Sequence, residues 1–114
     1  MPREFGRNVR IAEVIRRVAA PILNAAARTN ALGMVTITEV LVSGDLTLAR
    51  ILVSVYGGKD APDLAALRAE LPDLRSAVAR EMRIRKVPQL ALELDHSIAQ
   101  GARIAELLHT PSKS

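Results

Sequence analysis

Four cationic side chains lie close together in the segment REMRIRKVPQLALELD, which spans residues 80–95. They are Arg80, Arg83, Arg85 and Lys86. Arginine and lysine are the side chains that bind phosphate groups, arginine through two parallel hydrogen bonds and lysine as a point charge. The run could equally be the solvated end of a helix, because cations there complement the negative end of the helix dipole. The residues of this run alone leave both interpretations open.

The positive charge of the chain is concentrated in two segments. Residues 1–30 carry six Arg and two Glu, a net charge of +4, and residues 80–89 carry four basic side chains and one Glu, a net charge of +3. The whole chain is at +4, so the remaining 74 residues sum to −3. This distribution predicts a surface for a polyanion if the two segments meet in space. An acidic protein would suit the same surface, and this alternative stays open.

One short stretch has the residue types of a hydrolytic triad, namely Asp95, His96 and Ser97. Three consecutive residues that leave a strand point in different directions, whereas a triad needs the imidazole between the other two groups. We therefore expect His96 on the surface and Ser97 at a helix cap, and we predict that the chain is not an enzyme. The chain has no Cys, and His96 and His109 are too far apart in sequence to indicate zinc. No metal, cofactor or small-molecule substrate is expected.

The 114-residue chain has the length of one domain, predicted over residues 1–109 with a loose tail over residues 110–114. Its 49% hydrophobic and 25% charged residues are typical of a globular protein. Phe5 and Tyr56 are its only aromatic residues, so a platform for stacking nucleic-acid bases is not expected. The N-terminal residues lack the apolar core of a secretory signal, and the apolar runs are too short to span a membrane. We expect a soluble, cytoplasmic monomer with no membrane partner.

The basic residues must be positioned by the elements around them, and the first of these is a helix. Asn8 is a suitable N-cap, and the helix is predicted to run to about Thr29. Its predicted buried residues recur at spacings of four, three and four: Ile11, Ile15, Val18 and Ile22. Pro21 lies inside this pattern and should bend the helix. Gly33 is expected to adopt a positive φ where the chain leaves the helix.

Two β-branched, alternating segments follow, VTITEVLVS and LARILVSVY, and the short GDLT between them predicts a hairpin turn. In the first strand the apolar positions shift by one across Thr38 and Glu39, which predicts a β-bulge there. The second strand should bury Ala49, Ile51, Val53 and Val55. One face of this hairpin therefore needs a cover.

The segment after the hairpin supplies that cover as two helices. The first should begin at Asp60 or Ala61 and end at Pro72, because proline disfavours the helical conformation of the residue before it. A second helix resumes from Pro72. The predicted buried residues are Leu64 and Leu67 in the first helix, and Leu71, Leu74, Val78 and Met82 in the second. The predicted outer residues of the second helix are Ser76, Arg80 and Arg83.

VPQLALELD predicts a third strand, with Pro88 at its entrance, where no ladder donor is needed. Its inward residues should be Leu90, Leu92 and Leu94. A capping box at Ser97 and Gln100 predicts a short last helix to about Leu108. The order is helix, strand, strand, helix, kink, helix, strand and a short C-terminal helix. This order predicts an α+β fold of two layers, a three-stranded sheet covered by helices on one face.

The order and the residues together resemble the ribosome-binding factor A family. The resemblance runs from REFGR through LGMVTITEVLVSGDLTLARILVSVY and LRSAVAREMRIRKVPQL to LDHSIAQGARIAELL, which is nearly the whole chain. Its most specific pieces are VSGDLTLARILVSV and LRSAVAREMRIRKVPQL. The resemblance implies a type II KH-like fold. Like the family, this chain lacks the G-x-x-G loop with which many KH domains hold single-stranded nucleic acid.

The resemblance implies a ribosome-assembly factor without enzymatic activity. Such a factor binds the small (30S) ribosomal subunit, contacts 16S rRNA and assists late maturation, including processing of the 5′ end of that RNA. The family is also associated with cold adaptation. The alternative, from a different functional class, is a protein-interaction module that docks its basic face on an acidic protein partner.

The resemblance also indicates which residues face RNA. The first group is Arg80, Arg83, Arg85 and Lys86, and the second group, from the first helix, is Arg7, Arg10 and Arg17. The family has an A-x-G interhelical kink where this chain has Glu70, Leu71 and Pro72, so both small residues are replaced. A carboxylate there would repel phosphate, while Pro72 can still set the bend. Arg75 is expected to be structural and to pair with Glu70 or Asp73.

Overall fold

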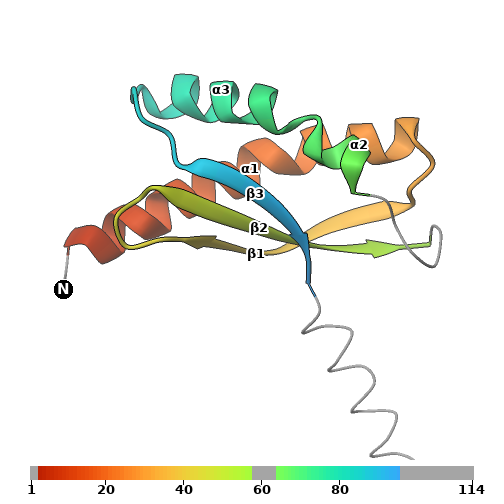
Figure 1. Ribbon diagram of the computed structural model, residues 1–114, viewed down its shortest axis with the longest axis horizontal. Helices are drawn as coiled ribbons and strands as arrows, with labels where there is room; N and C mark the ends of the chain where they lie inside the picture. The colour runs from red at the N-terminus through yellow and green to blue at the C-terminus, as the bar shows by residue number, and fades with distance from the viewer. Residues whose placement is uncertain (1–2, 58–63, 96–114) are drawn as a thin grey trace, which may run out of the picture.

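The computed structural model describes residues 3–57 and 64–95. Its elements follow the chain as α1 (Arg3–Thr29), β1 (Met34–Val42), β2 (Leu48–Tyr56), α2 (Ala65–Arg68), α3 (Leu71–Met82) and β3 (Gln89–Leu94). The strands form one three-stranded sheet in the order β1-β2-β3, and the helices lie on one of its faces (Figure 1). The predicted two-layer α+β architecture is therefore confirmed. Outside the described residues lie the predicted helix start at Asp60 or Ala61, His96, His109, the capping box at Ser97 and Gln100, the last helix and the tail.

α1 begins earlier than the sequence predicts. Asn8 lies inside the helix, so its predicted role as a cap was wrong. Its side-chain amide donates instead to the carbonyl oxygens of Val42 and Ser43 at the end of β1, each at 3.4 Å. An amide group that can cap a helix can equally bond a carbonyl of a neighbouring strand. The helix continues through Pro21. Gly33 has a φ of 95°, as predicted for the residue that leads into β1.

The buried face of α1 is only partly the predicted one. Ile11 and Ile15 are buried as expected, whereas Val18 and Ile22 are half-buried. The buried stripe continues instead at spacings of four through Ala19, Leu23 and Ala27. The prediction followed the large apolar side chains and passed over alanines, which let a helix approach its neighbours closely.

β1 and β2 pair antiparallel, and the predicted β-bulge is present. Ile37 pairs with Val53 and Glu39 pairs with Leu52, so Thr38 is the extra residue of β1. The apolar residues on both sides of the bulge are buried under the helices: Val35, Ile37 and Val40. The bulge therefore corrects the phase of the strand, as the shift in its sequence pattern requires.

β3 pairs with β2 in parallel, with Ala49 opposite Leu90. Parallel neighbours cannot be joined by a tight turn, so α2 and α3 form the crossover between them. Pro88 is buried directly before the strand, at the entrance where it was predicted. The N–H of Gln89 donates to the carbonyl of Thr47 at 2.9 Å, which joins the start of β3 to the β1–β2 turn.

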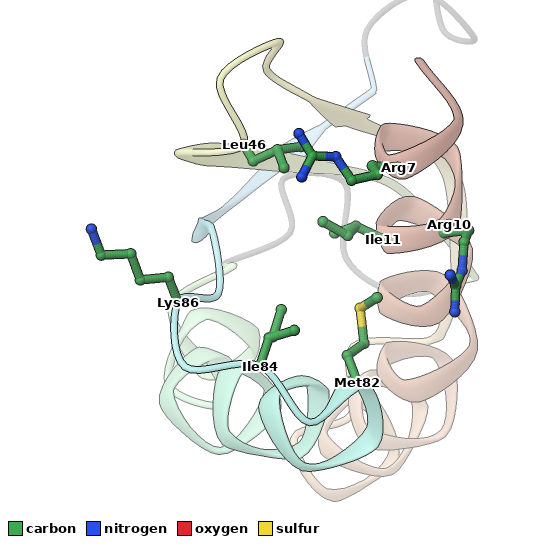
Figure 2. Close-up of a pocket in the computed structure, with 7 residues that line it drawn as sticks. All are labelled: Arg7, Arg10, Ile11, Leu46, Met82, Ile84 and Lys86. Atoms are coloured by element: carbon green, nitrogen blue, oxygen red, sulfur yellow. The ribbon is translucent and has the colours of Figure 1, made fainter. Parts of the chain in front are cut away.

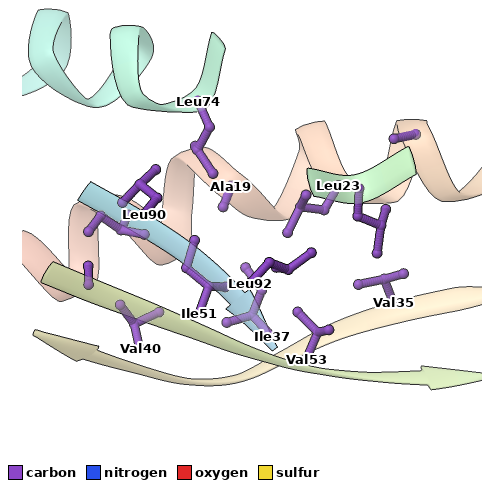
Figure 3. Packing of buried hydrophobic residues seen from close by; sticks show 14 of the residues in the cluster. Ala19, Leu23, Val35, Ile37, Val40, Ile51, Val53, Leu74, Leu90 and Leu92 are labelled. Atoms are coloured by element: carbon purple, nitrogen blue, oxygen red, sulfur yellow. The ribbon is translucent and has the colours of Figure 1, made fainter. Parts of the chain in front are cut away.

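The core lies between the helices and the inner face of the sheet (Figure 3). Its fully buried large side chains include Ile15, Leu23, Ile51, Val53, Leu67, Leu74, Val78 and Leu92. Besides Val18 and Ile22, four further predicted core residues are only half-buried: Val55, Leu71, Met82 and Leu94. All four lie at or near the ends of their elements, where the opposite layer covers them incompletely.

The joint between α2 and α3 overlaps the predicted kink only at Glu70. α2 ends at Arg68, and α3 already includes Leu71 and Pro72. Only Ala69 and Glu70 separate the helices, and both keep right-handed helical dihedral angles. The prediction that Pro72 ends a helix was wrong, because a proline in the first turn of a helix has a suitable φ and needs no partner for its nitrogen.

Candidate nucleic-acid interface

The two basic segments meet at one end of the molecule. The N-terminal half of α1, the β1–β2 turn and the loop from α3 to β3 gather there (Figure 1). Its exposed cations are Arg7, Arg10, Arg80, Arg83, Arg85 and Lys86, which we call the basic end. Within residues 3–57 and 64–95, no hydrogen bond or ion pair engages the charged groups of these side chains. Their charges are therefore available to a ligand.

A hollow of about 390 Å³ lies between these segments (Figure 2). Its floor is apolar and consists of Ile11, Leu46, Met82 and Ile84, and its rim carries Arg7, Arg10 and Lys86. In Figure 2, Ile11 points into the hollow from α1, and Met82 and Ile84 point into it from the end of α3 and the loop that follows. The sequence predicted a surface for a polyanion on condition that the two basic segments meet in space. They do meet, on either side of this hollow.

The remaining cations of the basic end surround the C-terminus of α3. Arg80 and Arg83 are exposed, as predicted for the outer face of this helix. Arg83 caps the helix with φ 56° and ψ 43°, a left-handed conformation that favours glycine. Arg85 lines a separate hollow of about 300 Å³ with Pro72 and Arg75. The basic end is therefore not a flat surface but a cluster of cations on several sides of one helix terminus.

Arg17 lies further along α1 and is paired. Its guanidinium lies 3.2 Å from a carboxylate oxygen of Glu81 in α3. The two side chains are 62% and 45% exposed, so solvent screens the pair and it contributes little to stability. The pair neutralises the one acid within the basic run, which leaves the other cations of that run uncompensated.

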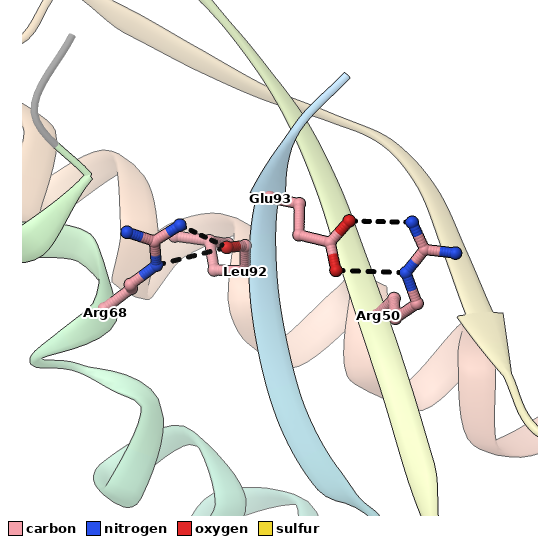
Figure 4. A network of polar contacts seen from close by, with 4 residues as sticks. All are labelled: Arg50, Arg68, Leu92 and Glu93. Carbon is pink, nitrogen blue, oxygen red and sulfur yellow. Dashed lines mark hydrogen bonds and ion pairs between the residues drawn. The ribbon is translucent and has the colours of Figure 1, made fainter. Parts of the chain in front are cut away.

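Two arginines bond the outer edges of the sheet. Arg16 of α1 donates to the carbonyl oxygens of Ile37 and Thr38 at 3.2 and 3.4 Å. Arg68 of α2 donates through two nitrogens to the carbonyl of Leu92 at 3.2 and 3.0 Å (Figure 4). In both edge strands, β1 and β3, a helix side chain therefore bonds backbone carbonyls. This hinders either edge from pairing with a strand of another chain. These arginines are structural.

Arg75 is also structural, but its predicted partners were wrong. It donates to the carbonyl oxygen of Val87 at 2.9 Å instead of pairing with Glu70 or Asp73. The bond joins α3 to the loop before β3. An exposed ion pair contributes little to the stability of the fold, whereas a hydrogen bond from a charged donor to a backbone carbonyl is stronger and fixes the direction of the contact.

The open face of the sheet has its own arginine, and that charge is neutralised. Arg50 donates through two nitrogens to both carboxylate oxygens of Glu93 at 3.0 and 2.7 Å (Figure 4). These bonds hold the pKa of Glu93 below its ordinary value and raise the pKa of Arg50. The pair leaves no surplus of positive charge at this position.

The β1–β2 turn that borders the hollow is organised by Asp45. One of its carboxylate oxygens accepts hydrogen bonds from the Thr47 hydroxyl at 2.7 Å, the Ser43 hydroxyl at 2.8 Å and the Thr47 N–H at 3.2 Å. These bonds, the Thr47 hydroxyl first, lower the pKa of Asp45. The next residue, Leu46, has a φ of 62° and lines the hollow.

The apolar floor of the hollow was not predicted from the sequence. Met82 was assigned to the core, while Ile84 and Leu46 were assigned to no buried face. The available signals were an isoleucine between Arg83 and Arg85, and a leucine in a polar turn. An apolar side chain in such surroundings is unexpected unless it has a neighbour from another segment.

Of the residues that match the family's kink, Glu70 lies away from the basic end, whereas Pro72 shares a hollow with Arg85. Glu70 is half-buried and lines a hollow with Ile22 and Thr29 from the C-terminal part of α1. The length of α3, 12 residues, separates this joint from the basic end.

No helix within the described part of the chain has both the length and the apolar character needed to cross a membrane. In the same ranges, no three side chains among His, Asp and Glu are grouped so that they could hold a metal ion.

Known proteins share this sequence over nearly its whole length. The family model described as Ribosome-binding factor A matches residues 7–108. The ribosome-binding factor A of Pseudomonas fluorescens strain Pf0-1 is 37% identical over 112 residues, which cover 95% of this chain and 84% of that relative. The protein of the same description from Alkalilimnicola ehrlichii is 37% identical over 111 residues, which cover 95% and 85%.

Solved structures share the fold. The crystal structure of ribosome-binding factor A from Thermus thermophilus has a TM-score of 0.63 at 23% identity, and the match covers 76% of this chain and 93% of that one. A homology model of the Thermus thermophilus factor, fitted into a cryo-electron-microscopy map of its complex with the 30S subunit, has a TM-score of 0.59 at 24% identity and covers 73% and 89%. These likenesses confirm the KH-like fold that the resemblance implied. With the match over residues 7–108, they show that the chain belongs to the ribosome-binding factor A family.

Proposed function

We propose that this chain binds the small (30S) ribosomal subunit by contacting 16S rRNA through its basic end. The observation that carries the proposal is the meeting of two basic segments at one end of a member of this family. The fitted complex of the Thermus thermophilus relative with the 30S subunit supports the choice of partner. A cluster of exposed arginines is best suited to bind the phosphate groups of a nucleic acid.

In this proposal the first group of contacts is Arg80, Arg83, Arg85 and Lys86, and the second group is Arg7, Arg10 and Arg17. Arg17 would exchange Glu81 for a phosphate. The protein assists late maturation of the subunit, including processing of the 5′ end of 16S rRNA, by binding alone, and separate nucleases cut the RNA. It acts as a cytoplasmic monomer, and its contribution is expected to matter most in the cold.

Charge reversal at the basic end tests this proposal. The double variant Arg80→Glu, Arg83→Glu should lose co-sedimentation with small subunits and keep its circular dichroism spectrum, because both side chains are exposed. The matched control compares Arg80→Glu with Arg28→Glu. Arg28 is also exposed on a helix but lies in the last turn of α1, at the opposite end of the molecule (Figure 1). A double variant that still co-sediments would place the RNA contact on another surface.

Binding should also weaken steeply with salt, because contacts to phosphate release bound counterions. If about five phosphates are contacted, a plot of log Kobs against log salt concentration should have a slope near −4, at roughly 0.7 to 0.9 per phosphate. A salt-insensitive interaction would contradict an electrostatic interface.

A protein-interaction module that docks only on an acidic protein is the second candidate, and the same cluster of available cations favours it. Nuclease treatment of a lysate separates the two. It should release the chain from its complexes if RNA holds it, and it should leave the complexes intact if a protein does.

A further inference from the structure

The hollow at the basic end joins an apolar floor to a cationic rim. The floor is Ile11, Leu46, Met82 and Ile84, and the rim is Arg7, Arg10 and Lys86. None of the described residues that line it is acidic. Its volume of about 390 Å³ falls within the range of about 300 to 1,000 Å³ that is typical of ligand pockets. A ligand that fills it must therefore present an apolar group and negative charge together.

Leu46 shows that the apolar floor is maintained against local backbone preference. Its φ of 62° lies in the left-handed region, which glycine and asparagine adopt far more readily than leucine. The turn is polar on both sides of it, with Asp45 bonded to Ser43 and Thr47. An asparagine would suit this turn better, so the turn itself does not explain the leucine, whose side chain packs against the edge of the core and also lines the hollow. Residues in strained conformations are concentrated at binding sites, where the side chain they present is needed.

The floor offers no hydrogen-bonding side chain. A nucleobase inserted there would bury the donors and acceptors of its edge against aliphatic groups, and each unpaired buried group weakens binding. A large aliphatic or aromatic side chain has no such groups, and its burial is favourable. Carboxylates on either side of it would lie near Arg7, and the long side chains of Arg10 and Lys86, which point away from the hollow in Figure 2, would turn toward it to bind them.

We propose that the hollow binds a segment of a partner protein in which one or two large apolar side chains are flanked by acidic residues. This proposal goes beyond the RNA-binding function and depends on different atoms at the same end of the molecule. The rim cations serve both ligands, so charge reversal there weakens both. The floor serves the peptide alone, so an apolar-to-polar change in the floor separates them.

The test uses a blocked, fluorescein-labelled hexapeptide whose sequence is two glutamates, a leucine, a phenylalanine and two glutamates. By fluorescence anisotropy it should bind about tenfold more tightly than a peptide with two serines in the centre. The variant Leu46→Asn should remove most of this advantage. The same variant should bind a short single-stranded RNA of mixed sequence as the unmodified protein does.

Leu46→Asn is expected to fold, because asparagine tolerates the left-handed conformation. A thermal melt checks this, and Ile84→Ser is a second change in the floor. The matched control is Leu41→Asn, since Leu41 is a partly exposed leucine of β1 that does not line the hollow. It should leave peptide affinity unchanged.

Two results would overturn the proposal. If both peptides bind equally, the hollow recognises charge only. If Leu46→Asn weakens RNA as much as it weakens the peptide, a nucleotide occupies the floor. Neither result bears on whether Arg80 and Arg83 hold the chain on the small subunit, so the two proposals fail separately.

Discussion

The hydroxyl of Thr38 donates a hydrogen bond to a carboxylate oxygen of Asp95, and so joins the bulge of β1 to the residue directly after β3. β2 lies between these strands, and the N–H of Asp95 donates to the Val53 carbonyl of β2 at 2.8 Å. Asp95 is only 9% exposed. The bulge therefore does more than correct the phase of β1, because the extra residue supplies a donor to a buried carboxylate just beyond the end of β3.

Replacing the bulge residue should destabilise the fold. Thr38→Val keeps the shape of the side chain but leaves the Asp95 carboxylate one donor short, so we expect a loss of about 1 to 3 kcal/mol in the free energy of unfolding. Thr36→Val, on an exposed position of the same strand, should change it by less than about 0.5 kcal/mol. Urea unfolding measures both. Equal effects would mean that the hydroxyl of Thr38 has no special role.

Arg83 combines an available cation with a strained backbone, and two variants separate these properties. Arg83→Gly should stabilise the protein by about 0.5 to 1 kcal/mol, because glycine adopts the left-handed cap conformation without a steric penalty. Arg83→Ala should not stabilise it. Both should lower affinity for RNA to the same extent, since both remove one charge. A gain in stability for Arg83→Ala would point to relief of charge repulsion instead.

Neighbouring arginines of α1 should differ in their roles. Arg16→Ala removes two bonds to carbonyls at the edge of β1 and should lower the free energy of unfolding by about 1 to 2 kcal/mol. Arg17→Ala removes an exposed ion pair with Glu81, which is worth less than about 1 kcal/mol. By contrast, Arg17→Ala should lower the affinity for RNA more than Arg16→Ala does. Thermal melts measure the stability of the two variants, and a filter-binding assay measures their affinity for RNA.

The β1–β2 turn should loosen in acid. Hydrogen bonds hold the pKa of Asp45 below its ordinary value, so the folded turn favours the ionised carboxylate. Its contribution to stability is complete above the ordinary pKa of an aspartate, about 3.9, and is lost as the pH falls through the lowered value. A carbon-13 titration should report the lowered pKa, and Thr47→Val should return it toward that of a short peptide. An unchanged pKa in Thr47→Val would exclude the hydroxyl as its main cause.

Local patterns in the sequence were sufficient for much of the fold. Alternation of apolar residues predicted both strands of the hairpin, and a shift of one position predicted the bulge at Thr38. Side chains in a strand alternate between two faces, so a strand with one buried face must signal any change of register in its own residues. The positive φ of Gly33 and the strand entrance at Pro88 follow from equally local rules.

The sequence did not separate the arginines by role. Arg16 and Arg68 bond carbonyls that are 21 and 24 residues away along the chain, while Arg80 and Arg83 remain available to a ligand. A long polar side chain bonds whichever acceptor the packed elements bring near it, and residue type and periodicity carry no information about that acceptor. Asn8 was wrongly assigned to a helix cap because the sequence does not show that the carbonyls of Val42 and Ser43 lie within reach of its amide.

By itself, therefore, the sequence determined the family, the order of the elements and most of the faces they bury. The tertiary structure decided that β3 runs parallel to β2, that the two basic segments meet, and that Ile11 and Ile84 share the floor of one hollow. Burial patterns arise from the repeat of a single helix or strand. These other features join residues far apart in the chain, so they exist only once the helices have packed on the sheet.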